Sequence, residues 1–417
     1  MSFDLNVIHA AHLARVRDRG GPRRGKLQGE LDLLADGAIA IRKGRIVAVG
    51  ETTTVLRECG DAVPTVNAAG MSVVPGLVEC HCHPIFAGRR HWEYVRRLQG
   101  AGCAEIRAEG GGIWSTILAT RQAEDNHLLE RTAEAYRRIL AGGVTTLEVK
   151  SGYGLTAEHE LRLLRLLRQS AAQTPMDLVY TFLGAHIAPQ DGPTPESWAR
   201  EIRETVLPAV MAQGIAELHD ITCEEGDYSF SIARELMDDS RRRGIPARVH
   251  ADASLDSRGW RTAVEGGAVS ADHLTYTPDE EIRSVGAAET IAVLLPLAEQ
   301  FYLEPRRANA RLFVQEQVPV AIATDYCSSF QATSLALAIS MACCWFRMTP
   351  AEAIVGATLN AAYALRRNHD RGSLDVGKRG DLTILDCAHP NEIGVCIGAP
   401  LVRCVISQGR VIYRSGE

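Results

Sequence analysis

The fold is decided by the stretch Val73-Val-Pro-Gly-Leu-Val-Glu-Cys-His-Cys-His83. It predicts a short apolar strand opened by a Pro-Gly pair and ended by two histidines one residue apart. In extended backbone, residues i and i+2 point to the same side, so His81 and His83 can aim both imidazoles at one point. Imidazole binds zinc, iron, copper and nickel. Taken alone, the pair is equally compatible with two ordinary loop histidines, and further ligands elsewhere in the chain decide between the two.

Composition narrows the class of protein. The chain has 417 residues, 46% of them hydrophobic and 23% charged, which is ordinary for a globular protein of two or three domains or of one large barrel with an appendage. Its 45 basic and 51 acidic residues are well mixed, so no nucleic-acid partner is expected. No apolar run of membrane-spanning length and no signal-peptide pattern is present. The 11 scattered cysteines, without a paired CxxC set, predict reduced thiols and a cytoplasmic location.

Both ends of the chain have the sequence pattern of β-hairpins. Residues 37–41 and 45–49 flank a glycine-containing turn at 42–44. Toward the other end, short β-branched runs occupy residues 381–385, 402–406 and 410–413. Because chain termini often lie close in space, we expect residues 1–72 and 373–417 to form one composite β-sandwich domain.

The middle of the chain, residues 73–372, alternates between strands and helices. The expected strands are 77–80, 144–149, 178–184, 218–222, 246–249, 269–272, 290–295 and 319–324. The expected helices are 123–141, 157–172, 195–212, 229–243, 257–266, 277–285, 305–316 and 332–346. Eight such strands favour an α/β fold of the (β/α)8 barrel type over an open doubly wound sheet.

Polar side chains gather at the predicted strand ends, where barrel enzymes place their chemistry. They are His81, His83, Lys150 within the segment 148–154, His186, His250, His273 and Asp325. The histidines at positions 127, 159 and 369 fall in polar helical or loop contexts and are expected to be solvated, and His219 within a strand is expected to be structural. The joint arrangement predicts a metal site.

The residue types suggest a chemistry. His81, His83, His250 and Asp325 would bind one divalent metal, and a water molecule in its open position would have a pKa lowered toward ~7. His273 would act as general base or polarise the carbonyl under attack, and Asp325 could carry a proton to the leaving nitrogen. Lys150 admits two interpretations: a carbamate bridging two metals, or a structural or substrate-facing lysine, which is favoured.

Several motifs along nearly the whole chain support a resemblance. They are residues 75–83, Gly110-Gly-Gly-Ile-Trp-Ser-Thr116, Glu148-Val-Lys-Ser-Gly-Tyr-Gly-Leu155, Thr181-Phe-Leu-Gly-Ala-His186, Val269-Ser-Ala-Asp-His-Leu274, Thr290-Ile-Ala-Val-Leu-Leu-Pro296 and Gly372-Ser-Leu-Asp-Val-Gly-Lys-Arg-Gly-Asp-Leu382. The chain resembles the amidohydrolase superfamily and, within it, the imidazolonepropionase family. The segment 148–155 is the most specific of these motifs.

The resemblance implies a barrel with a composite β-sandwich, a cytosolic homodimer, one zinc or iron ion with zinc first, and hydrolysis of a cyclic amide. It assigns His81, His83, His250 and Asp325 as ligands and His273 as the water-activating group. It also places Arg90, Tyr153 and His186 against the substrate. Arg90 would anchor a carboxylate tail, since guanidinium binds carboxylate in a two-pronged pair.

Three positions depart from the family pattern. Ala253 stands where a glutamate usually follows the metal-binding histidine by three residues. Cys103 aligns with a tyrosine that helps to hold the substrate. The loop that normally reads Asn-Pro-Gly-Ser-Ser after the metal-binding aspartate is Tyr326-Cys-Ser-Ser-Phe330 here, so that Cys327 enters the pocket.

These departures lead to a hypothesis about the substrate. Ala253 can neither accept a hydrogen bond from a ring N–H nor carry a proton, whereas it opens space and removes a charge. We therefore expect a modified imidazolone propionate, N-methylated or sulfur-substituted, to be opened to a formiminoglutamate-type product. The alternatives are an ordinary imidazolonepropionase of histidine degradation, a weakly constrained or partly inactive paralogue, a heterocyclic-amine deaminase, which would need a carboxylate near Ala253, and a non-catalytic barrel, against which the full ligand set counts.

Overall fold

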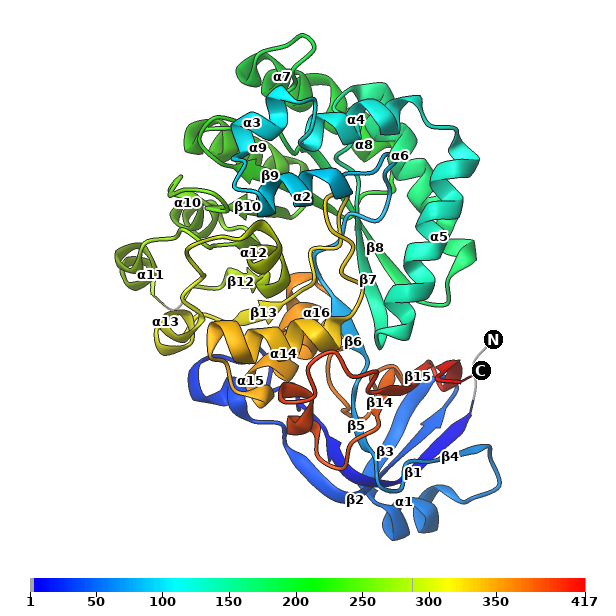
Figure 1. Cartoon of the computed structure of the whole chain (residues 1–417). Helices are drawn as coiled ribbons and strands as arrows, with labels where there is room; N and C mark the ends of the chain where they lie inside the picture. Colours follow the sequence, from blue (N-terminus) through cyan, green and yellow to red (C-terminus); the bar gives the residue numbers. More distant parts are fainter. Residues whose placement is uncertain (1–3, 287, 417) are drawn as a thin grey trace.

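The computed structural model describes residues 4–286 and 288–416 (Figure 1). Two sheets of eight strands each organise the chain. One is a parallel barrel, and the other is built from both chain ends and lies below the barrel in Figure 1.

The barrel strands follow one another in chain order around the sheet. They are β6 (Leu77–Glu79), β7 (Val144–Lys150), β8 (Asp177–Ala185), β9 (Leu218–Cys223), β10 (Ala247–Ala251), β11 (Ser270–His273), β12 (Ile291–Leu294) and β13 (Val320–Ile322). All eight predicted strands are confirmed, and so is the (β/α)8 class. An isolated parallel bridge between Cys82 and Tyr326, with the His83 N–H donating to the Tyr326 carbonyl at 2.8 Å, joins the first and last strands at their carboxyl ends.

Most of the predicted helices surround this sheet. They are α5 (Asp125–Ala141), α6 (Ala157–Ser170), α9 (Phe230–Arg243), α10 (Gly259–Gly266), α11 (Asp279–Val285), α13 (Ala310–Gln315) and α14 (Leu335–Phe346). The predicted helix 195–212 consists of α7 (Pro195–Glu201), a π-helical turn (Ile202–Val206) and α8 (Leu207–Gln213). The helix expected from residue 305 begins only at Ala310, because the Asn309 side chain caps it by accepting the Leu312 N–H at 3.2 Å.

Several helices were missing from the sequence prediction. Between β6 and β7, the short helices α2 (His91–Leu98), α3 (Cys103–Ala108) and α4 (Ile113–Gln122) lie close together in Figure 1. Also unforeseen were α1 (Thr52–Cys59), α12 (Pro296–Tyr302), α15 (Pro350–Val355) and α16 (Ala361–Ala364). Most of these helices have eight residues or fewer, too short to show helical periodicity clearly.

The sheet from the chain ends has the order β16-β15-β14-β5-β1-β2-β3, with β4 also paired to β1. Its strands are β1 (Leu5–Ala14), β2 (Leu33–Arg42), β3 (Arg45–Glu51), β4 (Thr65–Asn67), β5 (Ser72–Pro75), β14 (Leu382–Leu385), β15 (Val402–Ser407) and β16 (Arg410–Arg414). The predicted hairpin turn is confirmed: Lys43 and Gly44 both have positive φ, 51° and 75°, as a two-residue hairpin loop of the primed type requires.

The stretch 73–83 divides between the two sheets at its Pro-Gly pair, and the strand expected after that pair is β6. β5 pairs with β1 and β14 in the end sheet, and the chain then crosses into the barrel as β6. Gly76 stands at the crossing, where a Cβ atom would lie 2.3 Å from the Thr145 Oγ1 atom, so no larger residue fits there. The sheets change at Gly76, a few residues beyond the limit at 72 expected for the domain.

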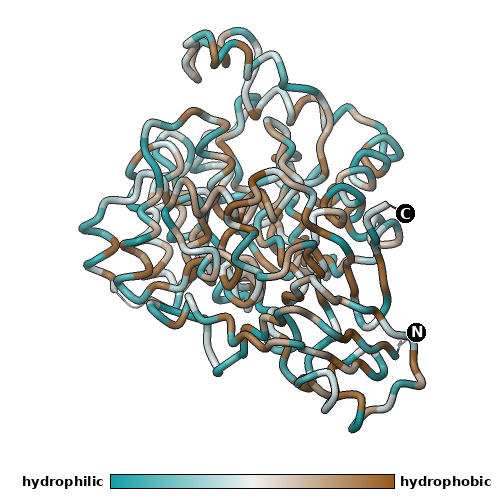
Figure 2. The backbone as a smooth tube through the Cα atoms, turned by 60° about the horizontal axis from the view of Figure 1, so that its bottom comes forward, coloured by the Kyte–Doolittle hydropathy of each residue, from teal (hydrophilic) through white to brown (hydrophobic). Residues whose placement is uncertain are grey.

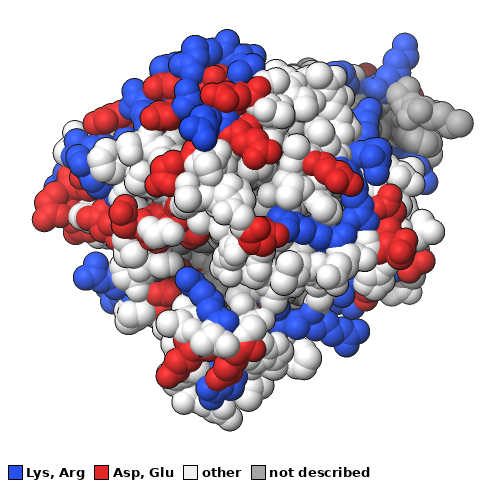
Figure 3. Space-filling view, turned by 90° about the horizontal axis from the view of Figure 1, so that it is seen from above, with Lys and Arg blue, Asp and Glu red and all other residues white. Residues whose placement is uncertain are grey.

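Hydropathy and charge follow this architecture. The most hydrophobic backbone segments gather in the interior and hydrophilic ones lie toward the periphery (Figure 2). On the face seen from above, acidic and basic side chains are interspersed (Figure 3). Among the described residues, no helix has the length and apolar character needed to cross a bilayer.

Candidate metal centre and active-site cavity

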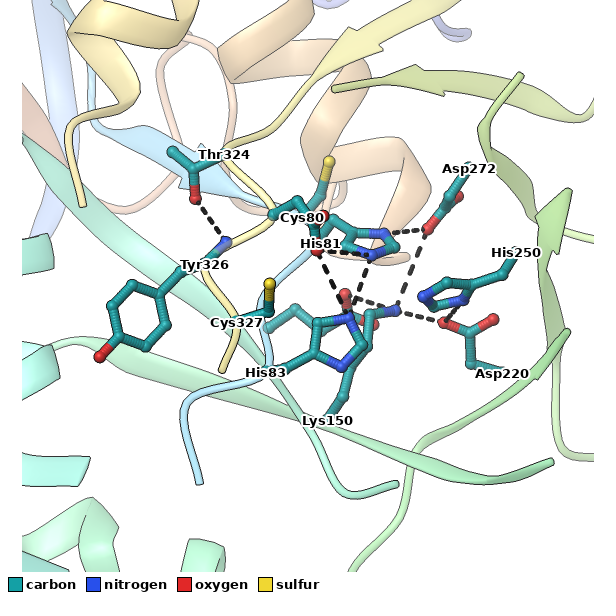
Figure 4. A network of polar contacts seen from close by, with 12 residues as sticks. Cys80, His81, His83, Lys150, Asp220, His250, Asp272, Thr324, Tyr326 and Cys327 are labelled. Atoms are coloured by element: carbon teal, nitrogen blue, oxygen red, sulfur yellow. Dashed lines mark hydrogen bonds and ion pairs between the residues drawn. The ribbon is translucent and has the colours of Figure 1, made fainter. Parts of the chain in front are cut away.

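The predicted metal ligands converge at the carboxyl ends of the barrel strands (Figure 4). The Nε2 atoms of His81 and His83 are 3.2 Å apart, and they lie 3.6 and 3.7 Å from the Asp325 Oδ1 atom. His250 and His273 complete the cluster, since one ligand atom from each lies within 4.8 Å of the other and of a His81 nitrogen. The five side chains come from the ends of β6, β10, β11 and β13.

Local backbone geometry aims these groups. His273 and Asp325 have positive φ angles, 80° and 55°, in the left-handed region that costs free energy for a non-glycine residue. The Glu79 carboxylate accepts hydrogen bonds from the N–H groups of His81 at 3.1 Å and Thr324 at 3.1 Å. Glu79 therefore fixes the ends of the first and last barrel strands relative to each other.

A buried carboxylate sets the tautomer of His81. The Nδ1 atom of His81 lies 2.6 Å from the Asp272 Oδ2 atom, so Nδ1 carries the proton that it donates and Nε2 presents a lone pair to the cluster. The Asp220 Oδ2 atom lies 3.1 Å from the His250 Nδ1 atom, close enough for an ion pair but outside hydrogen-bond geometry. Neither Asp220 nor Asp272 was proposed as a site residue from the sequence. Their signal was a carboxylate inside a predicted barrel strand.

The donor set fits a divalent cation. Two ligands of a tetrahedral zinc ion with bonds of ~2.0–2.1 Å lie about 3.3–3.4 Å apart, close to the 3.2–3.7 Å separations found here. Burial lowers the pKa of His81 and His83 well below the ordinary value, which keeps the imidazoles neutral and able to bind metal. Burial also raises the pKa of Asp325, so an ionised Asp325 calls for positive charge beside it.

Lys150 belongs to a buried ionic network. Its Nζ atom contacts Asp220 and lies 2.9 Å from the Glu148 Oε2 atom, while Arg248 donates to Glu148 at 2.9 Å and to Asp272 at 2.6 Å. Burial and the nearby Arg248 would lower the pKa of Lys150, but Asp220 and Glu148 outweigh them and raise it. A carbamate needs a neutral amine, and a substrate contact needs exposure that Lys150 lacks. Lys150 is therefore a structural residue and not a metal-bridging or substrate-binding one.

A cavity of about 270 Å³ lies over the cluster. It is lined by nearly all the predicted site residues: His83, Arg90, Cys103, Tyr153, His186, His250, Ala253, His273, Asp325 and Cys327. His81 is fully buried beneath the cavity wall. The structure thus brings together every predicted site residue.

Arg90 is held by a carboxylate that sequence reasoning missed. Its Nε and Nη2 atoms donate to the two oxygens of Glu93 at 2.8 and 2.9 Å, and Nη1 donates to the Ser328 hydroxyl at 3.1 Å. Burial would lower the pKa of Arg90, but the Glu93 carboxylate outweighs it and raises that pKa. Three of the five guanidinium N–H groups are thereby engaged, and two remain for a ligand.

His186 and Tyr153 form the wall beside His83. The His186 Nδ1–H donates to the Gly152 carbonyl at 2.9 Å, which leaves Nε2 as an acceptor, and burial lowers the pKa of His186 to about 3. The ring of His186 stacks on that of His83 with centroids 5.2 Å apart. The Tyr153 hydroxyl accepts the Ser328 N–H at 3.4 Å. These contacts hold two neutral polar groups at the cavity surface.

The two cysteines occupy different parts of the cavity. Cys103 is exposed, and its sulfur lies 3.6 Å from the Arg97 Nη1 atom. Cys327 is buried, its sulfur lies 3.2 Å from the Ser329 hydroxyl, and burial raises the pKa of its thiol to about 11. Tyr302, which the sequence did not single out, contacts the same serine and lies 4.0 Å from the Cys327 sulfur.

A carboxyl group, that of Glu224, lies beside Ala253 and lines the same cavity. The Glu224 oxygens accept the N–H groups of Ala253 at 3.0 Å, Ser254 at 2.8 Å and Leu255 at 3.1 Å. Burial raises the pKa of Glu224 to about 7. Glu224 therefore fixes the loop that carries Ala253 and was a further omission of the sequence reasoning.

Comparison with known proteins agrees with this geometry. The model of the Amidohydrolase family matches residues 72–412. The fold is similar to that of an adenosine deaminase from Xanthomonas campestris with bound zinc (TM-score 0.69, 17% identity, 98% of this chain and 92% of that one). It is also similar to a Xaa-Pro dipeptidase (TM-score 0.71, 17% identity, 99% and 100%). At these identities the solved structures show the fold alone. The chain belongs to the amidohydrolase family.

Sequence relatives narrow the class. Imidazolonepropionase of Geobacillus kaustophilus is 38% identical over 394 residues, covering 93% of this chain and 92% of the relative. That of Alkaliphilus oremlandii is 34% identical over 420 residues and covers both chains completely, and that of Haloarcula marismortui is 39% identical over 384 residues, covering 92% and 91%. Within the amidohydrolases, the chain is thus a member of the imidazolonepropionase family, a hydrolase of carbon–nitrogen bonds.

Proposed function

We propose that this hydrolase opens the ring of an imidazolone-propionate-type substrate at a C–N bond, giving a formiminoglutamate-type product. The observation that carries the proposal is the pair of overlapping groups His81–His83–Asp325 and His81–His250–His273, which share His81 beside a cavity whose wall presents Arg90. The relatives named imidazolonepropionase support the ring type.

His81, His83, His250 and Asp325 would hold one divalent cation, with zinc first and iron second. Such an ion supplies Lewis acidity, which acidifies a water molecule and polarises a carbonyl. The neutral imidazoles and the carboxylate are donors suited to either metal. The ion pairs that occupy Lys150 favour a single ion over a carbamate-bridged pair.

His273 and Asp325 would move the proton. Burial lowers the pKa of His273, so its imidazole is neutral and can accept a proton from the attacking water. The water oxygen forms a bond to the ring carbonyl carbon, and the C–N bond to the adjacent ring nitrogen breaks. That nitrogen takes up the proton that the water lost, which would pass from His273 to the Asp325 carboxylate and from there to the nitrogen.

Arg90 would fix the orientation of the substrate. Its two remaining N–H groups match a carboxylate tail, and Glu93 and Ser328 hold the guanidinium in one position. His186 and Tyr153 lie between Arg90 and the cluster as polar contacts for the ring. An anchored tail places the ring carbonyl at the same point in each catalytic cycle.

We also propose that the ring is modified, by N-methylation or by sulfur. The Ala253 side chain offers neither a donor nor an acceptor, and the neighbouring Glu224 carboxylate is held to the backbone by the N–H groups of Ala253 and Ser254. Cys103 and Cys327 make the wall softer and less polar than hydroxyl groups would.

The test compares kcat/KM for imidazolone propionate, its N-methyl derivative and its thio derivative. We expect one modified ring to exceed the unmodified ring by at least about tenfold, and Ala253→Glu to shift the preference toward the unmodified ring. Faster opening of the unmodified ring would support an ordinary imidazolonepropionase and reject the modified substrate. No opening of any ring by the metal-loaded protein would reject ring hydrolysis itself.

We further propose that the protein acts as a cytoplasmic homodimer. All 11 cysteines are free thiols, which is compatible with a reducing compartment. Light scattering of the purified chain and elemental analysis would test the dimer and the single zinc or iron ion. A monomer, or two metal ions per chain, would contradict these parts of the proposal.

A further inference from the structure

A second cavity, of about 660 Å³, lies beside the active-site cavity. The loop after β6, one face of α5 and the segment after β13 line it. Four arginines and two histidines contribute to its wall, and Glu134 is the only acidic residue among them. We refer to it as the arginine cavity.

Helix α5 presents its basic side chains to this cavity on one face. His127, Arg131 and Arg138 are spaced by four and seven residues, which places them on the same side of the helix. The Arg131 guanidinium lies over the Phe86 ring at 5.1 Å from its centroid, a contact that orients the guanidinium at the wall. The spacing therefore forms a basic stripe along the cavity.

The positive charge of the stripe is only partly balanced. Glu134 pairs with Arg138, and both side chains are more than half exposed, so this pair contributes little stability and can exchange partners. In the part of the chain that the structure describes, no carboxylate is paired with Arg89 or Arg131. Two guanidinium groups without acidic partners thus face one concave surface.

We propose that the arginine cavity binds a small multivalent anion through phosphate or carboxylate groups. Guanidinium presents parallel N–H donors that match both kinds of oxyanion. The ligand would bridge Arg89 and Arg131 and compete with Glu134 for Arg138. A volume of about 660 Å³ is sufficient for a molecule that carries two or three such groups.

The cavity shares part of its wall with the active site. Arg90, Ser328 and Ser329 line both cavities, and the Arg90 Nη1 atom donates to the Ser328 hydroxyl at 3.1 Å. An anion in the arginine cavity would compete with the substrate tail for the N–H groups of the Arg90 guanidinium. Because linkage is reciprocal, the anion should raise the KM for a carboxylated substrate with little change in kcat. This last step rests on the proposed function, whereas anion binding does not.

The test is calorimetric titration of the metal-loaded full chain at constant ionic strength, with fructose 1,6-bisphosphate and with tricarballylate. We expect saturable binding. Binding of the bisphosphate alone would identify a phosphate site, and binding of tricarballylate alone would identify a carboxylate site. Binding of both would identify a site that selects for negative charge and not for the type of oxyanion. The double variant Arg131→Gln/Arg138→Gln should weaken binding at least about tenfold. Arg137→Gln removes one positive charge from an exposed position of α5 outside the cavity and should leave binding unchanged.

Three results would overturn the proposal. One is the absence of saturable binding of either anion. Another is undiminished binding by a folded double variant, which would place the anion at the metal cluster. The third is a loss of anion affinity in Arg137→Gln equal to that in the double variant. If the chain hydrolyses no imidazolone ring, the titration still decides the anion site. If the chain does hydrolyse such a ring, the KM should rise with anion concentration in the unmodified enzyme and not in the double variant. That result would support the proposal that the anion and the substrate tail share the Arg90 guanidinium.

Discussion

The Nδ1 atom of His81 lies 2.6 Å from the Oδ2 atom of Asp272, and both side chains are fully buried. Arg248 donates to the same oxygen at 2.6 Å. With the Ser270 hydroxyl, which donates to the other oxygen at 2.7 Å, the carboxylate accepts three donors inside the barrel, and its position decides which nitrogen of His81 faces the metal cluster. Four predictions follow from contacts of this kind.

Asp272→Asn should weaken binding of the metal about 10- to 100-fold. The amide carries no charge and presents only one acceptor, so His81 loses the partner that fixes its tautomer and ring orientation. Competition with a chromophoric chelator measures the affinity. Asp239→Asn, which removes a carboxylate paired with Arg242 and Arg243 on α9, is the control. Equal metal affinity in Asp272→Asn and the unmodified protein would show that Asp272 is not needed to orient the ligand.

Lys150→Met should lower the free energy of unfolding by about 3–5 kcal/mol, because it leaves the buried carboxylates of Glu148 and Asp220 without their cation. Denaturant unfolding measures the change. Lys26→Met, at an exposed position, should have little effect. The number of metal ions bound per chain should stay the same in Lys150→Met. A halved metal content with unchanged stability would indicate a bridging lysine instead.

Arg90→Gln should raise the KM for a carboxylate-tailed substrate at least about tenfold, with a smaller effect on kcat, since the guanidinium binds the tail and not the reacting carbonyl. Steady-state kinetics with the best ring substrate provides the measurement. Arg97→Gln is the matched control, because Arg97 lines the same cavity but is directed to Cys103 and the Tyr302 ring. A larger increase in KM for Arg97→Gln than for Arg90→Gln would indicate that the substrate tail binds at Arg97 instead.

Ionisation of Glu299 should lower the free energy of unfolding as the pH rises from about 4.5 to about 7. Burial raises the pKa of its carboxyl from 4.5 to about 7, although Thr275, Ala308 and Trp345 donate hydrogen bonds to it. The folded state therefore holds the proton more tightly than the unfolded state, and stability is lost as the pH rises through this range and is constant above it.

Glu299→Gln removes this titration. Relative to the unmodified protein, the variant should gain up to about 3 kcal/mol on going from pH 4.5 to pH 8. Denaturant unfolding across this range is the measurement. Glu280→Gln, on the exposed side of α11, should give a curve parallel to that of the unmodified protein. Parallel curves for Glu299→Gln as well would contradict the raised pKa.

The barrel could be predicted from the sequence because its strands are short β-branched runs that alternate with long amphipathic helices. Each predicted strand agrees with the structure to within three residues at either end. The helices α2, α3 and α4 could not be foreseen in the same way. They are short segments whose register is set by packing above the barrel mouth and by caps such as Glu105, which accepts the Gly102 N–H.

The ligand cluster could be predicted because histidine is rare at strand ends unless it serves chemistry. The groups that orient the ligands could not. His81 and Asp272 are 191 residues apart in the chain, and Arg90 and Ser328 are 238 apart, so only the closed barrel brings them together. Glu224 was missed for the same reason, since its partners are backbone groups of the next strand's loop.

The bridge between Cys82 and Tyr326 has a consequence for biosynthesis. The two halves of the metal cluster stand on either side of the seam where the first strand meets the last. A nascent chain therefore displays His81 and His83 long before Asp325 leaves the ribosome, and no partial chain can close the ring of ligands. An ion bound by His81, His83 and Asp325 would hold the first and last strands together across the seam, and it cannot do so until Asp325 has been synthesised.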